Sequence, residues 1–367
     1  MKALTMTFHS SRNYGAVLQC FALQEVLKHY CQEVETIDFS NELIRSGAIP
    51  NSKGLKSIVR RILSIRYKRS INNKKIKFDK FVSDYISLTT HYETIEELRS
   101  MPPKADIVFT GSDQVFNPYR RGEEIPVYYL DFPCKYRASY AASFGNSIVP
   151  EKQKDLISNY LSRFDSISVR EDYGARIVYE LIGRKTEISV DPVFLLNKEK
   201  WAQLEEPYRG LPENYILIFN LRESDSKFLI GKQLKKKTKL PIVLITGKPN
   251  VPYWCDYVLR DVGPKEFLWL IDHCDFFLED SFHGTAFSII FEKQFLFCDD
   301  YPKSYERGRT LLDKIDLSCA YDIVNWDSNL IKKYDYDAIK KKLEEMILPS
   351  INYIEMVIGE VERKSNK

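Results

Sequence analysis

Short apolar runs alternate with amphipathic stretches along most of the chain. An apolar run that ends at Gly, Pro or Asp predicts a buried strand, whereas apolar positions three or four residues apart predict a helix. In the first half, the runs predict strands at 3–8, 34–39, 105–113, 137–145, 166–171 and 187–192. The stretches between them predict helices at 14–30, 151–164 and 172–181. This alternation is typical of an α/β domain built on a parallel sheet.

The same alternation starts again near Asn214, after an irregular seam at about 197–213. Here the predicted strands are 214–222, 241–247, 275–280 and 294–300, and the predicted helices are 227–237, 264–274 and 283–293. The length of 367 residues also exceeds the size at which a single core usually stops growing. We therefore expect two Rossmann-like, doubly wound domains that face each other across a cleft.

The expected organisation has three parts. A first α/β domain covers 1–200, a second covers 201–330, and C-terminal helices cover 331–367. Within the first domain, 41–100 is charged and irregular, so we interpret it as a basic, helical insertion. The tail has the pattern of amphipathic helices broken at Pro349, and we expect these helices to pack back across the domains.

Composition and charge restrict the class of protein. Hydrophobic residues make up 44% of the chain and charged residues 29%, which is typical of folded cores and argues against disorder. The 54 basic and 51 acidic residues leave a net charge of +3, too balanced to indicate a nucleic-acid partner. Basic residues do gather over 60–80, either as a solvated helical face or as a patch that meets anionic lipid or a lipid-linked diphosphate.

Cysteine usage and apolar runs bear on the compartment. The seven Cys are scattered without a CxxC pair, which is typical of free thiols in a reducing compartment. The N-terminal apolar run is too short for a signal peptide, and no run reaches the roughly 20 apolar residues of a membrane span. We therefore expect a cytoplasmic protein. The basic range 60–80 leaves peripheral binding at the inner membrane face open, and the sequence leaves the oligomeric state open.

The segment LEDSFHGTAF, at 278–287, is the first candidate site. An apolar strand ends at Asp280, Ser281 suits the N-cap of the next helix, and Gly284 allows close backbone packing. A helix N-terminus attracts phosphate or carboxylate groups. His283 lies at this same end, where an imidazole suits acid–base chemistry.

Other polar residues follow predicted strands of the first domain. Asp113 comes directly after a buried strand and suits either a proton acceptor or a local turn. Arg170 closes a strand and suits either an anion-binding group or a surface ion pair. Asn13 and Tyr14 stand at the first strand-to-helix turn, where they would line the cleft. Arg222 holds the place in the second block that Arg170 holds in the first.

Several cofactor motifs are missing. The chain has no GxGxxG and no Walker GxxxxGK[ST], so nicotinamide and ATP chemistry lack support. It also has no HExxH and no paired Cys/His set, and therefore no sign of a metal site. The absence of GxSxG removes support for a hydrolase nucleophile. The expectation is an enzyme without a cofactor.

An ordered set of segments resembles the polysaccharide pyruvyl transferase family. The matching segments are NYGAVLQ, FTGSDQVFNP, SYAASFG, SVRED, VDPVFLL and EDSFHGTAFSIIFEKQF, which begin at positions 13, 109, 139, 168, 190 and 279. The resemblance covers about residues 8–320. It implies a GT-B-like fold, phosphoenolpyruvate as donor substrate, and a sugar of a surface-polysaccharide precursor, free or lipid-linked, as acceptor. It further implies that His283 is catalytic, that Arg170 binds the donor, and that Asp113 is a candidate base.

The chain departs from the family pattern at one point. Many relatives carry Arg-Leu directly before His-Gly, where this chain has Ser281 and Phe282. The cation that would hold the donor there is missing. The candidates to replace it are Arg170, Arg222, Lys248 and Arg309.

The reaction that the resemblance implies needs a base, an acid and cationic support for departing phosphate. Asp113 and His283 are the expected pair for proton transfer, with their roles as acid and base left open. They would come from opposite domains, so we expect domain closure during catalysis. Two alternatives remain: a nucleotide-sugar-dependent glycosyltransferase on the same architecture, and a non-catalytic binding module in polysaccharide assembly.

Overall fold

The computed structural model describes residues 1–40, 58–120, 124–222, 224–298, 300, 306–321, 323 and 333–365. The side chains are described from Tyr67 onward in the helix that begins at Ile58, and the charged range 41–57 lies outside the described residues. The chain divides into two compact units. Unit 1 comprises 1–47, 82–196 and 343–367, and unit 2 comprises 48–81 and 197–342.

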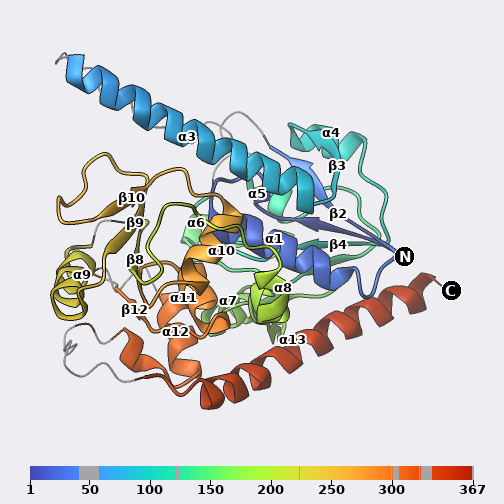
Figure 1. The fold of residues 1–367 in the computed structure, drawn as a ribbon. Helices are drawn as coiled ribbons and strands as arrows, with labels where there is room; N and C mark the ends of the chain where they lie inside the picture. The colour runs from blue at the N-terminus through green and yellow to red at the C-terminus, as the bar shows by residue number, and fades with distance from the viewer. Residues whose placement is uncertain are drawn as a thin grey trace. The chain divides into compact units, whose positions relative to one another are not determined.

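Unit 1 is built on a parallel five-stranded sheet of order β3-β2-β1-β4-β5 (Figure 1). Its strands are β1 (Lys2–Met6), β2 (Glu33–Phe39), β3 (Leu88–Tyr92), β4 (Ile107–Thr110) and β5 (Arg137–Ser139). Its helices are α1 (Tyr14–Leu27), α4 (Ile95–Ser100), α5 (Glu124–Tyr128), α6 (Glu151–Leu161) and α7 (Asp172–Ile182). A short parallel pair, β6 (Ser168–Val169) and β7 (Glu187–Ile188), precedes the 3₁₀ helix η1 (Pro192–Leu195). All four residues of β4 are buried, as expected for a parallel strand covered on both faces.

Unit 2 repeats this topology with the order β10-β9-β8-β11-β12. The strands are β8 (Ile216–Asn220), β9 (Ile242–Thr246), β10 (Tyr257–Leu259), β11 (Phe276–Glu279) and β12 (Phe295–Phe297). The helices are α8 (Lys198–Ala202), α9 (Asp225–Thr238), α10 (Pro264–Asp272), α11 (Phe282–Ile290) and α12 (Glu306–Lys314), followed by the 3₁₀ helix η3 (Ser318–Ala320). Every residue of β8, β9 and β11 is buried. In both units the first strand is central, and later strands add on either side, which is a doubly wound arrangement.

Two long helices belong to parts of both units. The helix α3 (Ile58–Tyr85) contributes its residues up to 81 to unit 2, and α13 (Tyr336–Ser365) contributes its residues from 343 onward to unit 1. Figure 1 shows α13 as one long helix that leads to the C-terminus. The predicted fold class is thus confirmed: two Rossmann-like sheets in one chain, with a helical C-terminal tail.

The structure differs from the sequence prediction at two edge strands. The range 41–100 was interpreted as a helical insertion, but it supplies β3, an edge strand of the first sheet. Only Tyr92 of this strand is buried, so its residues LTTHY lack the apolar alternation that would have indicated a strand. The strand β10 was not predicted: it has three residues at the edge of the second sheet, and only Leu259 among them is buried.

A second difference lies at Pro349, where the predicted helix break is wrong because α13 continues through this residue. The Ser350 hydroxyl donates to the Met346 carbonyl at 3.0 Å and accepts a hydrogen bond from the Val190 N–H at 2.9 Å. Beyond the proline, the helix belongs to unit 1, and the Tyr353 hydroxyl donates to the Ser139 carbonyl of β5 at 2.9 Å. Its buried stripe consists of Tyr353, Ile354, Val357, Ile358 and Val361. Burial of this stripe, about 1.5–3 kcal/mol for each large apolar side chain, offsets the cost of about 3 kcal/mol for a proline inside a helix.

Among the described residues, no helix combines the length and the apolar character that crossing a bilayer requires.

Replacing Ser350 by Ala tests the anchoring of α13. The variant leaves the buried Val190 N–H without its acceptor, which should cost about 1–3 kcal/mol of unfolding free energy and lower the thermal midpoint. Ser365→Ala is the matched control, since Ser365 makes the same bond to the carbonyl four residues earlier in the same helix but is exposed. Equal midpoints for the two variants would contradict this account.

Candidate functional site

The topological switch point of unit 2 lies between β8 and β11, the two strands from which the sheet grows in opposite directions. Ligands of doubly wound sheets bind at the carboxyl ends of such strands. The register pairs Leu278 with Ile218, and its continuation brings Asp280 beside Asn220. The helices α9 and α11 both begin just beyond these strand ends, so the segment predicted from LEDSFHGTAF stands at the switch point.

The first turn of α11 is built on a buried glutamate. Ser281 caps the helix, because its Oγ accepts the Gly284 N–H at 2.9 Å. Glu279 accepts the Ser281 N–H at 2.5 Å and the Thr285 hydroxyl at 2.6 Å. A Cβ added at Gly284 would lie 2.5 Å from Oε2 of Glu279, which explains why this turn requires glycine. His283 is 9% exposed, and its ring meets that of Phe282 edge-on.

Glu279 is itself a group that the sequence interpretation missed. Burial raises the pKa of its carboxyl to about 8, while the hydrogen bonds from Thr285 and Ser281 oppose the shift. Near neutral pH the group therefore keeps a proton beneath the helix N-terminus. The sequence signal that could have indicated Glu279 is an acidic residue type at the end of an apolar strand. Such residues are rarely buried unless they are paired.

A buried ion pair ties the ends of β8 and β11 together. The Lys227 ammonium lies 2.8 Å from Oδ2 of Asp280 and donates to the Phe219 carbonyl at 3.0 Å. The backbone N–H of Arg222 also donates to Oδ2 of Asp280, at 3.0 Å. Lys227 is fully buried, although the sequence placed it only at the start of a basic helix. Removing either partner would leave an uncompensated charge in the core.

Two oxygens at this switch point have no hydrogen-bond partner among the described residues. They are Oδ1 of Asn220 and Oδ1 of Asp280, and both side chains are buried. Buried acceptors of this kind are ordinarily satisfied by a donor such as water or a ligand hydroxyl. Asn220 could have been found from sequence, because it is a polar residue that closes an otherwise apolar strand.

Three residues of unit 2 were candidates for the cation that is missing before His-Gly, and they lie at different places. Arg222 has an exposed side chain and meets Asp280 through its backbone, whereas Arg309 lies over the ring of Tyr321 at 5.1 Å. Lys248 is in the loop after β9, where its carbonyl accepts from Arg260. A cation not selected from sequence, Arg307, lies over the ring of Phe282 at 6.0 Å and so beside the first residue of α11.

In unit 1, the corresponding switch point lies between β1 and β4 and brings Asp113 and Arg170 into one cluster. Arg170 is buried, with Nη2 2.5 Å from Oδ2 of Asp191, and it donates to the Ser112 hydroxyl. Burial alone would lower the pKa of Arg170, but Asp191, Asp113 and Glu171 hold it above its ordinary value. The surface ion pair considered from sequence is therefore replaced by a buried one.

The remaining predicted residues of unit 1 have local roles in the structure. Oδ1 of Asp113 accepts the N–H of the next residue, Gln114, at 2.8 Å, and the φ of Asp113 is 63°. Asn13 is the exposed N-cap of α1, with Oδ1 3.3 Å from the Ala16 nitrogen. Tyr14 is buried as the first residue of that helix.

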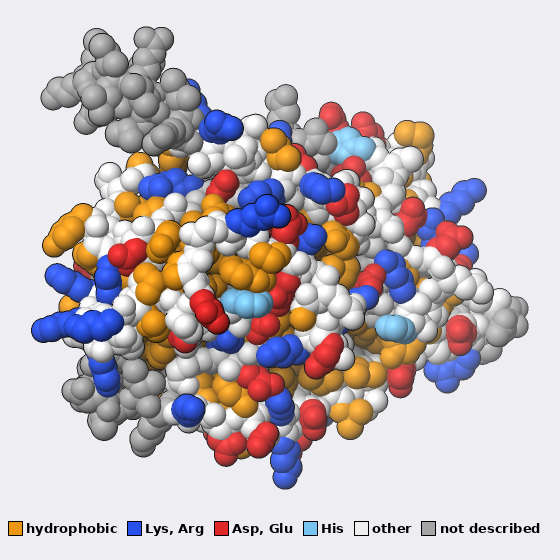
Figure 2. All heavy atoms as spheres, in the orientation of Figure 1, with side chains coloured by type: hydrophobic (Ala, Val, Ile, Leu, Met, Phe, Trp, Pro, Cys, Tyr) orange, Lys and Arg blue, Asp and Glu red, His pale blue; other side chains and the backbone are white. Residues whose placement is uncertain are grey.

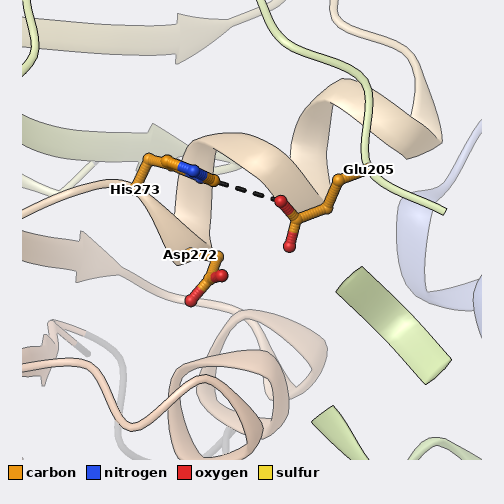
Figure 3. A group of neighbouring side chains, drawn as sticks. All are labelled: Glu205, Asp272 and His273. Atoms are coloured by element: carbon orange, nitrogen blue, oxygen red, sulfur yellow. Dashed lines mark ion pairs between the residues drawn. The ribbon is translucent and has the colours of Figure 1, made fainter. Parts of the chain in front are cut away.

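A third cluster in unit 2 comprises Glu205, Asp272 and His273 (Figure 3). Burial and Asp272 raise the pKa of Glu205 to about 7, which indicates a proton shared between the two carboxyl groups. Nδ1 of His273 lies 3.0 Å from the Trp269 carbonyl and 3.7 Å from Oε2 of Glu205. Because Nδ1 faces a carbonyl, it carries a proton, and the lone pair of the neutral ring is then on Nε2. Lys198, 3.5 Å from Asp272, adds positive charge, so the cluster suits a shared proton better than a cation.

Comparison with known proteins identifies one family and several distant folds. A family model described as polysaccharide pyruvyl transferase matches residues 13–301. No curated protein matches the chain by sequence.

The solved structures with similar folds include the MnaA–UDP co-structure from S. aureus, with a TM-score of 0.49 and 12% identity over 100% of this chain and 97% of that one. They also include UGT71G1 from Medicago truncatula with UDP-glucose, with a TM-score of 0.49 and 9% identity over 98% of both chains. The glycosyltransferase SnogD from Streptomyces nogalater has a TM-score of 0.42 and 14% identity over 97% of this chain and 99% of that one. These TM-scores are all below 0.5 and carry no conclusion about ligands.

Replacing Glu279 by Gln tests the protonated glutamate. The folded protein binds this proton more tightly than the unfolded chain, whose ordinary pKa is 4.5. Stability should therefore fall as pH rises from about 4.5 to about 8, by up to about 1.4 kcal/mol per pH unit. Gln cannot ionise, keeps one oxygen to accept the Ser281 N–H, and has an NH2 group that can donate to the Thr285 hydroxyl. The variant should therefore match the wild type in acid and exceed its stability above about pH 8.

The matched control for this measurement is Glu213→Gln, at an exposed position of the same unit. Its denaturant midpoint should follow the wild-type pH profile. A Glu279→Gln profile that also runs parallel to the wild type would show that the buried carboxyl is not protonated.

Proposed function

The chain belongs to the polysaccharide pyruvyl transferase family, and from this premise we propose that it transfers the pyruvyl group of phosphoenolpyruvate to a sugar of a surface-polysaccharide precursor. The product is a pyruvate ketal on that sugar. The observation that carries the proposal is the family match over 13–301, which includes the strand β11 and the helix α11 with the buried His283 in its first turn.

The geometry of unit 2 supports a donor site at the first turn of α11. The positive end of the helix dipole and the Ser281 cap stand at the switch point, where an anion is favoured. The protonated Glu279 carries no full negative charge that would repel a phosphate near neutral pH. Arg307, over the ring of Phe282, supplies a cation beside this turn. We assign to it the role that an Arg before His-Gly has in many relatives.

The reaction proceeds by addition and then displacement at C2 of the enolpyruvyl group. A sugar hydroxyl adds to C2 and loses its proton to a base, while an acid delivers a proton to C3, so that a methyl group forms. A second hydroxyl of the same sugar then bonds to C2 and loses its proton, and the C2–O bond to phosphate breaks. Phosphate leaves with the electron pair of that bond.

We assign the proton transfers to His283 and Asp113. His283 belongs to the same turn as the proposed phosphate site, so it can donate or accept a proton close to the donor substrate. The unpartnered oxygens of Asn220 and Asp280 suit hydroxyl groups of the sugar as hydrogen-bond acceptors. Asp113 and Arg170 are the candidates that unit 1 offers, as proton acceptor and anion-binding group respectively.

Replacing His283 by Ala should lower kcat about 10²–10⁴-fold, the usual range for loss of a general acid or base. The measurement is release of phosphate from phosphoenolpyruvate in the presence of acceptor. His29→Ala is the control, because His29 is exposed and follows the last residue of α1, at the opposite end of that helix from the turn after β1. Near-normal turnover by the His283 variant would exclude it from the chemistry.

A thermal-shift titration separates the donor classes. Phosphoenolpyruvate should raise the unfolding midpoint, because a ligand that binds only the folded state stabilises it. Arg307→Gln and Arg170→Lys should weaken this shift, the second through loss of the planar guanidinium fork. A shift with UDP or UDP-sugars alone would instead identify a glycosyltransferase. Binding of a glycan without any turnover would identify a binding module.

A further inference from the structure

The outer face of α9 in unit 2 carries a group of exposed lysines. Figure 2 shows Lys and Arg side chains gathered over the edge of the molecule where Figure 1 places α9. The exposed lysines are Lys232, Lys236, Lys237 and, directly after the helix, Lys239. Positions 232 and 236 are one helical turn apart, and position 229 lies one turn before them. The lysines thus form one surface with Leu229.

These four lysines differ from other basic residues of the helix in their partners. Lys235 pairs with Asp256 at 2.7 Å, and Lys227 pairs with Asp280 inside the core. None of the four exposed lysines has a carboxylate partner among the described residues. The face therefore presents positive charge that nothing in the described part of the chain neutralises.

Apolar side chains stand beside this charge. Leu229, on α9 itself, is 60% exposed, and Tyr253, in the loop between β9 and β10, is 93% exposed. The loop is fixed against the helix at the next residue: the ring of Trp254 meets that of Phe228, and the Trp254 carbonyl accepts from Lys235 at 2.7 Å. Tyr253 therefore projects from a loop that is anchored to α9. We call this surface, with the four lysines and these two side chains, the α9 face.

Lysines that lack carboxylate partners, together with exposed Leu and Tyr side chains, have the chemistry of a membrane-surface contact. Lysines attract the phosphates of anionic lipids, and a tyrosine ring suits the boundary between head groups and acyl chains. A purely polyanionic partner would leave Leu229 without an apolar environment. We propose that the α9 face binds reversibly to anionic lipid bilayers and holds unit 2 at the membrane surface.

The expected strength of lipid binding follows from the number of lysines on the α9 face. Each lysine near an anionic bilayer strengthens binding about fivefold, so removing three should weaken partition on the order of a hundredfold. The contribution is electrostatic and should fall as salt is added, whereas that of Leu229 and Tyr253 should persist. The proposed lipid binding does not depend on the proposed reaction.

The experiment is co-sedimentation of the full chain with vesicles of phosphatidylcholine alone and of phosphatidylcholine mixed with phosphatidylglycerol. The wild type should bind the mixed vesicles and not the neutral ones. The triple variant Lys232→Gln, Lys236→Gln and Lys237→Gln should lose about a hundredfold in partition. Gln is chosen because an acidic residue in the last turn would also destabilise the helix itself.

The matched control changes the same number of charges elsewhere. Lys104, Lys152 and Lys185 are exposed in unit 1, and no carboxylate partner is described for them. Their triple Gln variant has the same net charge as the α9 variant and should bind like the wild type. The double variant Leu229→Ser, Tyr253→Ser should reduce the binding that survives at high salt. Thermal unfolding of each variant verifies that it is folded.

Three results would overturn the proposal. The first is absence of wild-type binding to the mixed vesicles. The second is equal loss in the α9 and control variants, which would show a net-charge effect without a specific surface. The third is binding to a soluble polyanion, such as heparin, without binding to vesicles, which would point to an acidic macromolecule. Lipid binding is measured without substrate, so the two proposals fail separately. A negative lipid-binding result does not bear on pyruvyl transfer, and a negative result for pyruvyl transfer does not bear on lipid binding.

Discussion

The central strands of both sheets are buried on both faces, and this burial decides where polar side chains can lie. Along β8, for example, every residue before Asn220 is apolar. Polar groups are excluded from the strand interior by the cost of burying them without partners, so they appear where the strand stops. The two switch points, each next to the first strand of its unit, are therefore the places where charge and hydrogen-bonding groups collect.

In unit 2 this concentration of polar groups is stabilised by pairing. The ion pair of Lys227 with Asp280 connects the helix after β8 with the end of β11, so the turn that carries His283 is held from the opposite side of the switch point. The buried carboxyl of Glu279 stays protonated instead and accepts hydrogen bonds from the first turn of α11. One acid is neutralised by a cation and the other by a proton, which leaves the start of α11 suited to an anionic ligand.

The first turn of α11 departs from the family pattern in sequence and is still capped. Ser281 takes the position of the Arg that many relatives carry, and the serine hydroxyl caps the helix instead of supplying charge. Arg307, from a helix later in the chain, lies over the ring of Phe282 next to that cap. In unit 1, the buried pair of Arg170 with Asp191 gives the arginine a fixed position, so it cannot move freely to a ligand. The two arginines therefore differ in their surroundings: Arg307 is half-buried over an aromatic ring, whereas Arg170 is buried in an ion pair.

The sequence by itself determined what depends on neighbouring residues. The apolar runs predicted the central strands of both sheets, and the pattern around Gly284 predicted a strand, a cap and a helix, because capping and close backbone approach are local properties. Only the tertiary structure decided which distant groups meet. The contact of Lys227 with Asp280, the neighbourhood of Asn220 and Asp280, and the elevated pKa of Glu279 all require burial and partners from separate strands. Tertiary contacts also decide that α13 continues past Pro349. Proline by itself disfavours a helix interior, but the contacts of α13 within unit 1 outweigh this local preference.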